Sequence, residues 1–377
     1  MPKPKFLVTS AAGKTGLPTT LQLLDKGYPV RALVRRSDHR ADRLKSAGAE
    51  IFVGDQLAVS DLRRAMDGVQ RAYHCPPTDP NGLYYSAAFA IAANENRLEH
   101  IVSLSQWLAQ PDHPSLFTRE TWLGGGLLDL LPDTTVTVNN VGWFADNYFL
   151  VLEPAAQLGI LPMPLGEGDE KKNAPPSNED IAAVNVAALI DPAAHAGKVY
   201  RPTGPALLSP NEIAASIGKA LGRKVKYQDI SEAMFLKAVK AQGRPPAQYA
   251  QLRYYLKDYQ MGAFAVGAPS DAVRVVGGRD PEPFGSIARR YVATRPEAVR
   301  SPARRLAAVA FFARMLATPK PDMEAFERSR DHVLLTDPSY SLDSEEWRAR
   351  HDPAAGHRPD RPLAAAAPPR TASNAAA

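Results

Sequence analysis

The stretch Phe6-Leu7-Val8-Thr9-Ser10-Ala11-Ala12-Gly13-Lys14-Thr15-Gly16 decides the fold of this 377-residue chain. Its apolar start predicts a β-strand, and the apolar residues that follow, from Leu17 to Leu24, recur at helical spacing. A strand, a glycine turn and a helix in that order suit a bound pyrophosphate, because the turn lets the backbone approach the ligand and the helix start offers unpaired N–H groups. We therefore predict a dinucleotide site near the N-terminus.

The glycine spacing is Ser10-x-x-Gly13-x-x-Gly16 instead of the usual G-x-G-x-x-G. The prediction therefore also depends on the residues that follow this turn. A turn at Gly27-Tyr28-Pro29 and a second apolar segment, Val30 to Val34, complete a βαβ unit of the expected length. Arg35 and Arg36 then stand where an NAD site would place an acidic residue for the ribose 2′-hydroxyl. Cations there suit a 2′-phosphate, so we predict NADP(H) in preference to NAD(H). The alternative is that these arginines and Arg40 form an ordinary solvated basic surface.

Composition indicates a soluble globular protein, with 45% hydrophobic and 23% charged residues. No apolar run reaches the length of a membrane span, and the longest candidate is only Leu306 to Ala313. The N-terminus lacks the long apolar core of a secretory signal. A single Cys excludes an internal disulfide, so we expect a cytoplasmic location.

Strand and helix patterns alternate from the N-terminus to about residue 139, with further strands expected at 51–53, 71–75, 100–105 and 135–139. This alternation predicts an α/β fold, a Rossmann-type doubly wound parallel sheet with a smaller C-terminal substrate lobe. We divide the chain into a dinucleotide-binding domain, 1–205, with an irregular excursion at about 145–177, and a small substrate-binding lobe, 206–291. A helical basic extension, 292–350, and a disordered tail, 351–377, follow.

Several blocks in the same order resemble one known family. They are the segment 8–16, Val30-Arg31-Ala32-Leu33-Val34-Arg35, Gly54-Asp55, Thr118-Arg119-Glu120, Gly142-Trp143-Phe144-Ala145-Asp146-Asn147, Asp180-Ile181-Ala182 and Tyr200-Arg201-Pro202-Thr203-Gly204-Pro205. Over roughly residues 6–291 the chain resembles the NmrA-like, atypical short-chain dehydrogenase/reductase proteins, a group that contains both reductases and enzymatically silent redox sensors.

The resemblance implies a Rossmann domain that binds NADP(H) and a small lobe that binds substrate. Carried onto this sequence, it implies phosphate contacts from Ser10, Gly13, Lys14, Thr15 and Gly16. It further implies that Arg35 contacts the 2′-phosphate and that Asp55 and Gln56 lie at the adenine edge. Ser10 departs from the glycine that is commoner in the family at the first turn.

The usual proton donor of short-chain dehydrogenases is absent. That donor is a Tyr-x-x-x-Lys pair, in which the Lys lowers the pKa of the Tyr, and no Tyr here has Lys four residues later. Some relatives use a Lys on the helix after the fifth strand, but that stretch, 117–123, contains none. Hydride transfer remains feasible with water or a weaker donor, because it requires only the nicotinamide held against an electrophilic carbon.

Residues just past the strand ends are the candidates for facing the nicotinamide. Those assigned to catalysis are Ser105, Tyr73 and His74; those added to the cofactor site are Arg36, Cys75 and Ser103; those assigned to substrate are Trp107, Asn140, Trp143 and Phe144. For His74 and Cys75 we favour packed strand residues over catalysis. The large aromatic residues are as often core as substrate wall. Eight His residues without paired spacing predict no metal site.

A basic segment lies between Arg289 and Lys320, where eight basic residues face one acidic residue. Pro302 suits the first turn of a helix, Ala303 to Ala317, whose expected apolar side carries Leu306, Val309, Ala310, Phe312 and Leu316, widened by Phe311. Packing on the core is favoured over a homodimer contact, and both over an anionic membrane surface. Nucleic-acid binding ranks lower still, since no recognition helix accompanies the charge.

Two functions follow from these observations. The first is an NADPH-dependent oxidoreductase that reduces a small carbonyl, enone or quinone-like substrate. The second is a noncatalytic NADP(H) sensor that acts through a protein partner, and the missing Tyr-x-x-x-Lys pair favours it. Isomerase or epimerase activity with a tightly held cofactor is a third reading, which the same missing Tyr disfavours.

Overall fold

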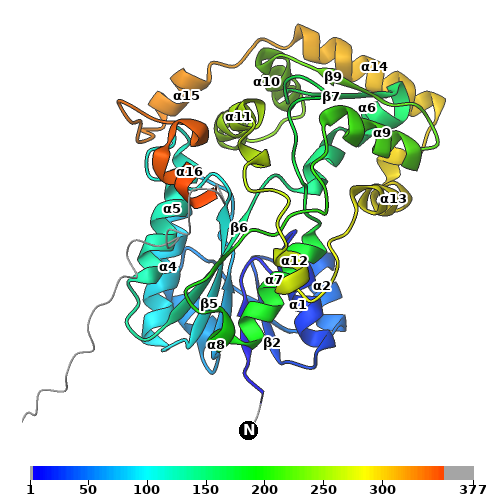
Figure 1. Cartoon of the computed structure of the whole chain (residues 1–377). Helices are drawn as coiled ribbons and strands as arrows, with labels where there is room; N and C mark the ends of the chain where they lie inside the picture. The colour runs from blue at the N-terminus through cyan, green and yellow to red at the C-terminus, as the bar shows by residue number, and fades with distance from the viewer. Residues whose placement is uncertain (1–2, 352–377) are drawn as a thin grey trace, which may run out of the picture.

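A seven-stranded parallel sheet forms the centre of the molecule in the computed structural model, which describes residues 3–351 (Figure 1). Its strands are β1 (Phe6–Val8), β2 (Val30–Val34), β3 (Glu50–Val53), β4 (Arg71–His74), β5 (His100–Gln106), β6 (Thr135–Val141) and β8 (Val199–Tyr200). Their order across the sheet is β3-β2-β1-β4-β5-β6-β8. The chain moves outward in both directions from β1, so the crevice where ligands bind lies beside the carboxyl end of that strand.

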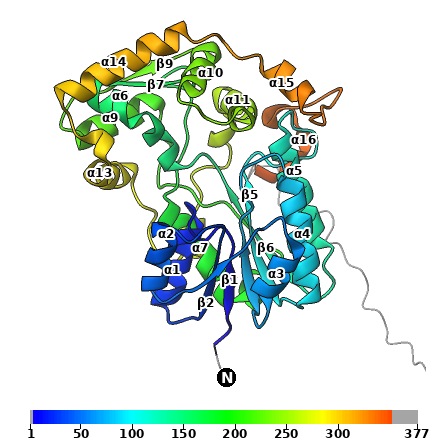
Figure 2. The ribbon, with the colours of Figure 1, turned by 180° about the vertical axis from the view of Figure 1, so that it is seen from behind.

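Helices cover both faces of this sheet (Figures 1 and 2). One face carries α1 (Gly16–Asp25), α2 (His39–Ser46) and α7 (Asn178–Ile190), and the other carries α3 (Val59–Met66), α4 (Gly82–Glu95) and α5 (Leu116–Asp129). The short α8 (Pro192–His195) leads from α7 into β8. The predicted doubly wound Rossmann-type fold is confirmed.

Strand β1 shows how the sequence builds the two layers. Successive side chains of a strand point to opposite faces, and all three residues of β1 are buried. Phe6 and Val8 pack in the cluster that includes α1 and α7, whereas Leu7 packs in the cluster that includes α3, α4 and α5. An apolar run buried on both sides is what a central parallel strand requires.

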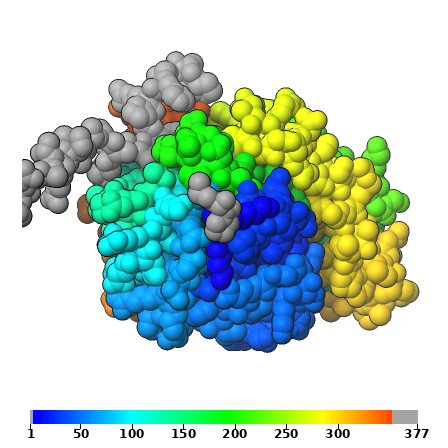
Figure 3. All heavy atoms as spheres, turned by 90° about the horizontal axis from the view of Figure 1, so that it is seen from below, coloured from blue at the N-terminus to red at the C-terminus, as the bar shows by residue number. Residues whose placement is uncertain are grey.

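The smaller lobe lies over the carboxyl ends of the strands (Figure 1). It contains η1 (Ala145–Val151), α6 (Leu152–Leu158), β7 (Ile160–Met163), α9 (Pro210–Ala220), β9 (Lys226–Asp229), α10 (Glu232–Ala241), α11 (Pro246–Met261), η2 (Ala263–Ala265), α13 (Phe284–Thr294) and η3 (Pro296–Ala298). A further short helix, α12 (Ala272–Val275), packs on α7 of the Rossmann domain. Seen from below, the blue and cyan Rossmann domain fills most of the face, and the yellow part of the small lobe lies beside it (Figure 3).

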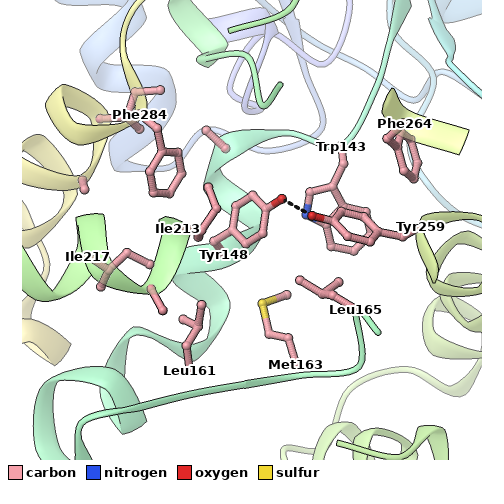
Figure 4. Packing of buried hydrophobic residues seen from close by; sticks show 14 of the residues in the cluster. Trp143, Tyr148, Leu161, Met163, Leu165, Ile213, Ile217, Tyr259, Phe264 and Phe284 are labelled. Carbon is pink, nitrogen blue, oxygen red and sulfur yellow. Dashed lines mark hydrogen bonds between the residues drawn. The ribbon is translucent and has the colours of Figure 1, made fainter. Parts of the chain in front are cut away.

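Residues 145–177, marked by the sequence as an irregular excursion, supply η1, α6 and β7 to the small lobe. Strand β7 pairs in parallel with β9, which lies more than sixty residues later in the chain. The lobe's core gathers around Trp143, Tyr148 and Tyr259, and the hydroxyl oxygens of the two tyrosines lie 2.9 Å apart (Figure 4). The smaller lobe is therefore built from two separated stretches of sequence.

The C-terminal extension contains α14 (Pro302–Ala317), α15 (Met323–Ser329), η4 (Ser341–Asp343) and α16 (Glu345–His351). Trp347 of α16 is fully buried, and its indole N–H donates to the carbonyl of Trp107 at 2.8 Å. The extension thus reaches back to the end of β5. The predicted disordered tail, 351–377, lies outside the described residues except for His351.

Only part of the expected apolar side of α14 faces the small lobe, namely the half-buried Phe311 and Phe312, which corrects the sequence prediction. Ala308 and Met315 are the buried residues of this helix, whereas Leu306 is 70% exposed, Val309 51% and Leu316 61%. The helix packs against α10 and α6. Apolar residues lie around most of α14, so periodicity alone could not identify the packed side.

No helix among residues 3–351 is both long enough and apolar enough to cross a membrane.

Candidate nucleotide-binding site

The turn between β1 and α1 leaves no room for side chains at its glycines. A Cβ on Gly16 would lie 2.3 Å from the carbonyl oxygen of Ser10, and one on Gly13 would lie 2.9 Å from the same atom. Ser10 itself adopts a φ of +47°, and the N–H of Gly13 donates to its carbonyl at 2.8 Å. A non-glycine residue seldom adopts this conformation. The turn therefore tolerates Ser at its first position and depends on glycine at the other two.

Polar side chains fix this turn to the neighbouring strand β4. The Ser10 hydroxyl donates to the carbonyl of Cys75 at 2.7 Å, and the amide of Gln56 donates to the Ser10 hydroxyl at 3.1 Å. The Tyr73 hydroxyl donates to Thr15 Oγ1 at 2.9 Å. Four residues predicted for the cofactor site, Ser10, Thr15, Gln56 and Cys75, are thus brought together in the structure.

The start of α1 suits an anion. Thr15 stands at the N-cap but makes no capping hydrogen bond with its side chain, and the first turn contains no acidic residue. The first N–H groups of a helix lack partners within the helix and carry a partial positive charge. Gly13 and Lys14 are exposed beside them. These features fit the diphosphate of a dinucleotide cofactor.

Two cations follow β2 at the same edge of the sheet. Arg35 and Arg36 are both exposed, and within residues 3–351 their side chains form no ion pair. Arg40, in contrast, is paired with Asp38 at 2.7 Å. The first two guanidinium groups are therefore free to meet a phosphate, whereas the third is already engaged.

The loop after β3 contains Asp55 and Gln56 and reaches the glycine turn. The Asp55 carboxylate accepts from the backbone N–H of Leu57 at 2.9 Å, and the backbone N–H of Asp55 donates to Asp61 at 2.9 Å. These bonds fix the loop in which Gln56 reaches Ser10. Asp55 itself is exposed, and its place at the adenine edge stays a prediction.

Lys14 joins the two lobes. Its ammonium nitrogen lies 2.7 Å from a carboxylate oxygen of Asp146 in η1, and this carboxylate is almost completely buried. Sequence reasoning placed Lys14 at the phosphates but missed its partner, although Asp146 stands in one of the blocks that carry the family resemblance. The ion pair spans the crevice between the Rossmann turn and the small lobe.

Two catalytic candidates are packed inside the Rossmann domain. Tyr73 is fully buried and its hydroxyl is used by Thr15. His74 is 2% exposed, its Nε2 lies 3.2 Å from Ser86 Oγ, and its ring packs on Phe89. Burial lowers the pKa of His74 to about 3, so the ring is neutral at physiological pH. His74 is thus packed in the way that the sequence analysis favoured, and Tyr73, a catalytic candidate, is packed as well.

Ser105 is half-buried near the carboxyl end of β5. It lines a small cavity of about 80 Å³ with Asn140, whose amide donates to the carbonyl of Gln106 at 2.8 Å. His351 at the end of α16 lines the same cavity. Ser103, two residues before Ser105, is buried within the strand. Among the catalytic candidates, Ser105 lines this cavity, whereas Tyr73 and His74 do not.

The aromatic substrate candidates are divided between core and cavity. Trp107 is 1% exposed and its indole N–H donates to the carbonyl of Ala263 at 3.1 Å. Trp143 is 3% exposed and packs on Tyr259, but one side of it lines a large cavity in the small lobe. Phe144 is half-buried at the start of η1. Trp107 is therefore a structural residue of the lobe contact.

Glu120 on α5 is a buried acid that sequence reasoning noted only as part of the family resemblance. It is 9% exposed, and its carboxylate faces the first turn of α4 at Gly82. Burial raises the pKa of Glu120 to about 7, although the backbone N–H groups of Gly82 and Leu83 oppose this shift. Helical spacing predicted that the residue lies on α5 but not that this side faces α4.

We expect Glu120 to make the folded state less stable as pH rises. Between about pH 4.5 and 7 the folded protein holds a proton that the unfolded chain has released, so the free energy of unfolding falls across this range. The Glu120→Gln side chain is neutral at every pH and does not titrate, so it contributes no such change. Urea unfolding at pH 5 and pH 8 should show the variant gaining stability relative to wild type at the higher pH. A stability difference that is the same at both values would contradict the raised pKa.

Within the described range, no group of three or more His, Cys, Asp or Glu side chains is placed to hold a metal ion.

Comparison with known proteins supports an NAD(P)H-binding domain. Residues 10–129 match the family model for NAD(P)H-binding proteins. The chain is 30% identical over 295 residues to an NAD(P)H azoreductase of Xenophilus azovorans, covering 76% of this chain and 98% of the relative. It is 34% identical over 276 residues to quinone oxidoreductase 2 of Escherichia coli, covering 70% of this chain and 90% of the relative.

Among solved structures, the crystal structure of NmrA, a negative transcriptional regulator in complex with NADP, shares the fold. Its TM-score is 0.57 at 17% identity, and the likeness covers 83% of this chain and 98% of that one. The sheet order is that of a doubly wound Rossmann fold, and the azoreductase is matched over 98% of its length. The chain belongs to the NmrA-like family of atypical short-chain dehydrogenase/reductases, whose Rossmann domain binds NAD(P)H.

Proposed function

We propose that the protein is an NADPH-dependent reductase of a small carbonyl, enone or quinone-like substrate. The observation that carries the cofactor assignment is the glycine turn at Gly13 and Gly16, with exposed Arg35 and Arg36 at the adjacent strand end. The similarity to an azoreductase and a quinone oxidoreductase supports reduction of a small conjugated molecule. When bound, the cofactor supplies a hydride, and a proton must come from elsewhere.

The preference for NADP(H) over NAD(H) is part of the proposal. A 2′-phosphate carries negative charge and several acceptor oxygens, which guanidinium groups bind in a fixed geometry. Arg35 and Arg36 offer two such groups, and in the described residues no carboxylate pairs with either. Nothing in that position resembles the acidic residue that holds a ribose 2′-hydroxyl.

The proton has a restricted set of sources on this chain. Tyr73 and His74 are packed away from solvent, and no Tyr-x-x-x-Lys pair exists. Ser105 lies near the carboxyl end of β5, opposite Asn140 of β6, and borders a cavity. Its hydroxyl is therefore the best placed of the three catalytic candidates to orient a substrate oxygen or a water molecule. We assign Ser105 this orienting role and take water as the proton source.

A second candidate function is a noncatalytic sensor of NADP(H) that binds a protein partner. The burial of Tyr73 and His74 favours it, as does the fold shared with a transcriptional regulator bound to NADP. This function requires the same nucleotide site but no substrate turnover. The two functions therefore differ in whether the protein turns over a substrate.

Turnover separates the two functions. With saturating NADPH and a panel of quinones, enones and aldehydes, we expect the absorbance of the reduced nicotinamide to fall with at least one substrate. At the same NADPH concentration the Gly16→Ala variant should show a much slower fall, because its turn holds the cofactor more weakly. Tight NADPH binding without turnover on any member of the panel would favour the sensor instead.

We propose further that the protein works in the cytoplasm on a small molecule and does not bind nucleic acid. A homodimer remains a prediction, and the exposed stripe of α14 formed by Leu306, Val309 and Leu316 is the surface that it would use.

A further inference from the structure

The small lobe contains a cavity of about 310 Å³ that no residue of the predicted nucleotide site lines. It lies between α10, α11 and α14, with β7 and the end of β6 on its other side. Most of its lining is apolar, and the larger side chains include Met234, Phe235, Leu252, Leu256, Phe312 and Met315. This volume is within the range of small-molecule sites and far exceeds that of one water molecule.

Helix α14 closes the cavity. Ala308, Phe311, Phe312 and Met315 line it from this helix, which lies beyond the part of the chain that resembles the family. The azoreductase relative is covered over 98% of its length by only 76% of this chain. The closing wall is therefore supplied by the part of the protein that adds to the family fold.

Several hydrogen bonds hold α14 in this position. The Ser301 hydroxyl caps its start, and the Lys237 ammonium donates to the carbonyl of Leu316 near its end at 3.2 Å. Gln157 of α6 donates to the carbonyl of Val299 at 2.9 Å just before the helix begins. The cavity thus lies under a helix that is held at both ends.

Charge at the cavity's edge indicates what kind of molecule fits. Arg244 and Arg314 both line it and are both exposed, and within residues 3–351 neither forms an ion pair. Arg314 lies over the Phe311 ring, 5.4 Å from its centre. The only acidic residue in the lining is Glu153. The Arg244 guanidinium donates to the side-chain oxygen of Gln242 at 2.8 Å, so its charge has a neutral partner only. An apolar interior beside two guanidinium groups without a carboxylate partner suits a ligand with an apolar body and an anionic end.

We propose that this cavity is a second ligand site, which binds an amphipathic small molecule with its apolar part under α14 and its carboxylate or sulfonate at Arg314 and Arg244. None of its lining residues belongs to the turn at 10–16 or to the arginines that follow β2. Trp143, two residues after β6, is the point where the cavity approaches the domain boundary. The site is independent of the nucleotide site in the residues that form it.

Calorimetry with the full-length protein and dodecanoate tests the apolar part of the proposal. We expect one site, and we expect Ala238→Phe, which places a ring in the cavity from α10, to weaken binding more than about tenfold. Ala310→Phe adds the same ring on the exposed side of α14, outside the cavity, and should leave the affinity within about twofold. Gln248→Trp, from the exposed mouth on α11, provides a second blocking variant that does not depend on repacking the core.

The charge requirement is tested on α14 itself. Arg314→Ala should weaken dodecanoate about three- to tenfold and leave dodecanol, which lacks the charge, unchanged. Arg305→Ala removes the same charge from the same helix without touching the cavity and should have no such effect. Absence of dodecanoate binding to wild type, or equal binding by Ala238→Phe, Gln248→Trp and wild type, would overturn the site. Equal effects of the two arginine variants would overturn the anionic end.

NADPH titration of the same samples keeps this proposal separate from the proposed function. The cavity variants should bind NADPH as wild type does, because no lining residue belongs to the predicted nucleotide site. Loss of dodecanoate binding with normal NADPH binding supports the cavity. Loss of both in every blocking variant would show that the two sites are one, which also contradicts the inference.

Discussion

Gly16→Ala should weaken NADPH binding by roughly a hundredfold, as measured by calorimetry. The added Cβ would stand 2.3 Å from the Ser10 carbonyl oxygen and 2.9 Å from the Ala11 Cα, both of which are backbone atoms. The turn can accept the methyl group only by moving away from α1. The N–H groups at the start of that helix would then no longer converge on the diphosphate.

The matched control is Gly125→Ala on α5, where a Cβ would meet nothing within 4 Å. This variant should bind NADPH like wild type, because its methyl group displaces no neighbouring atom and α5 contributes no residue to the glycine turn. Thermal unfolding of both proteins without nucleotide separates a damaged fold from a damaged site. A folded Gly16→Ala protein with unchanged NADPH affinity would show that the turn does not hold the diphosphate.

Arg35→Ala should weaken NADPH binding about ten- to a hundredfold and change NADH binding by less than about twofold. The difference arises because only NADPH carries the 2′-phosphate that the free guanidinium group meets. Competition between the two nucleotides at constant ionic strength measures both affinities, and constant salt is needed because exposed charges are screened.

Arg40→Ala is the control for this second prediction. Its guanidinium is already paired with Asp38 at 2.7 Å, so its loss should alter neither nucleotide's affinity by more than about twofold. If Arg35→Ala weakens NADPH and NADH equally, the arginine contributes only general stability or charge. The preference for NADP(H) would then need another origin.

Much of the Rossmann domain could be predicted from local sequence signals. The run Phe6 to Val8 is apolar on both faces, and most turns between strand and helix contain glycine or proline, so strand positions followed from short windows. The glycine turn was also predictable, because its backbone requirement leaves a mark at Gly13 and Gly16. These features depend on residues that are neighbours in the chain.

The small lobe could not be predicted in the same way, because its contacts join distant residues. Strand β7 finds its partner β9 more than sixty residues later. Helix α11 buries polar groups as well as apolar ones, including Asp258, whose carboxylate lies 2.7 Å from the ring of buried His113. A helix buried on several sides has no clear apolar stripe, so periodicity gives a weak signal.

The candidate site shows the same division. The positions of Ser10, Thr15 and Gln56 near one another followed from the resemblance and the turn, but the ion pair between Lys14 and Asp146 depends on how the two lobes meet. Likewise, no local signal could show that the Tyr73 hydroxyl donates a hydrogen bond to Thr15.

In the proposed site, backbone N–H groups at the start of α1 and the guanidinium groups after β2 together bind NADP(H). Calorimetric titration of the wild-type protein with NADPH and with NADH tests it most directly. We predict saturable binding of one NADPH per chain, at least about tenfold tighter than NADH. Equal affinities would contradict the role of the arginines, and absence of binding by either nucleotide would contradict the site itself.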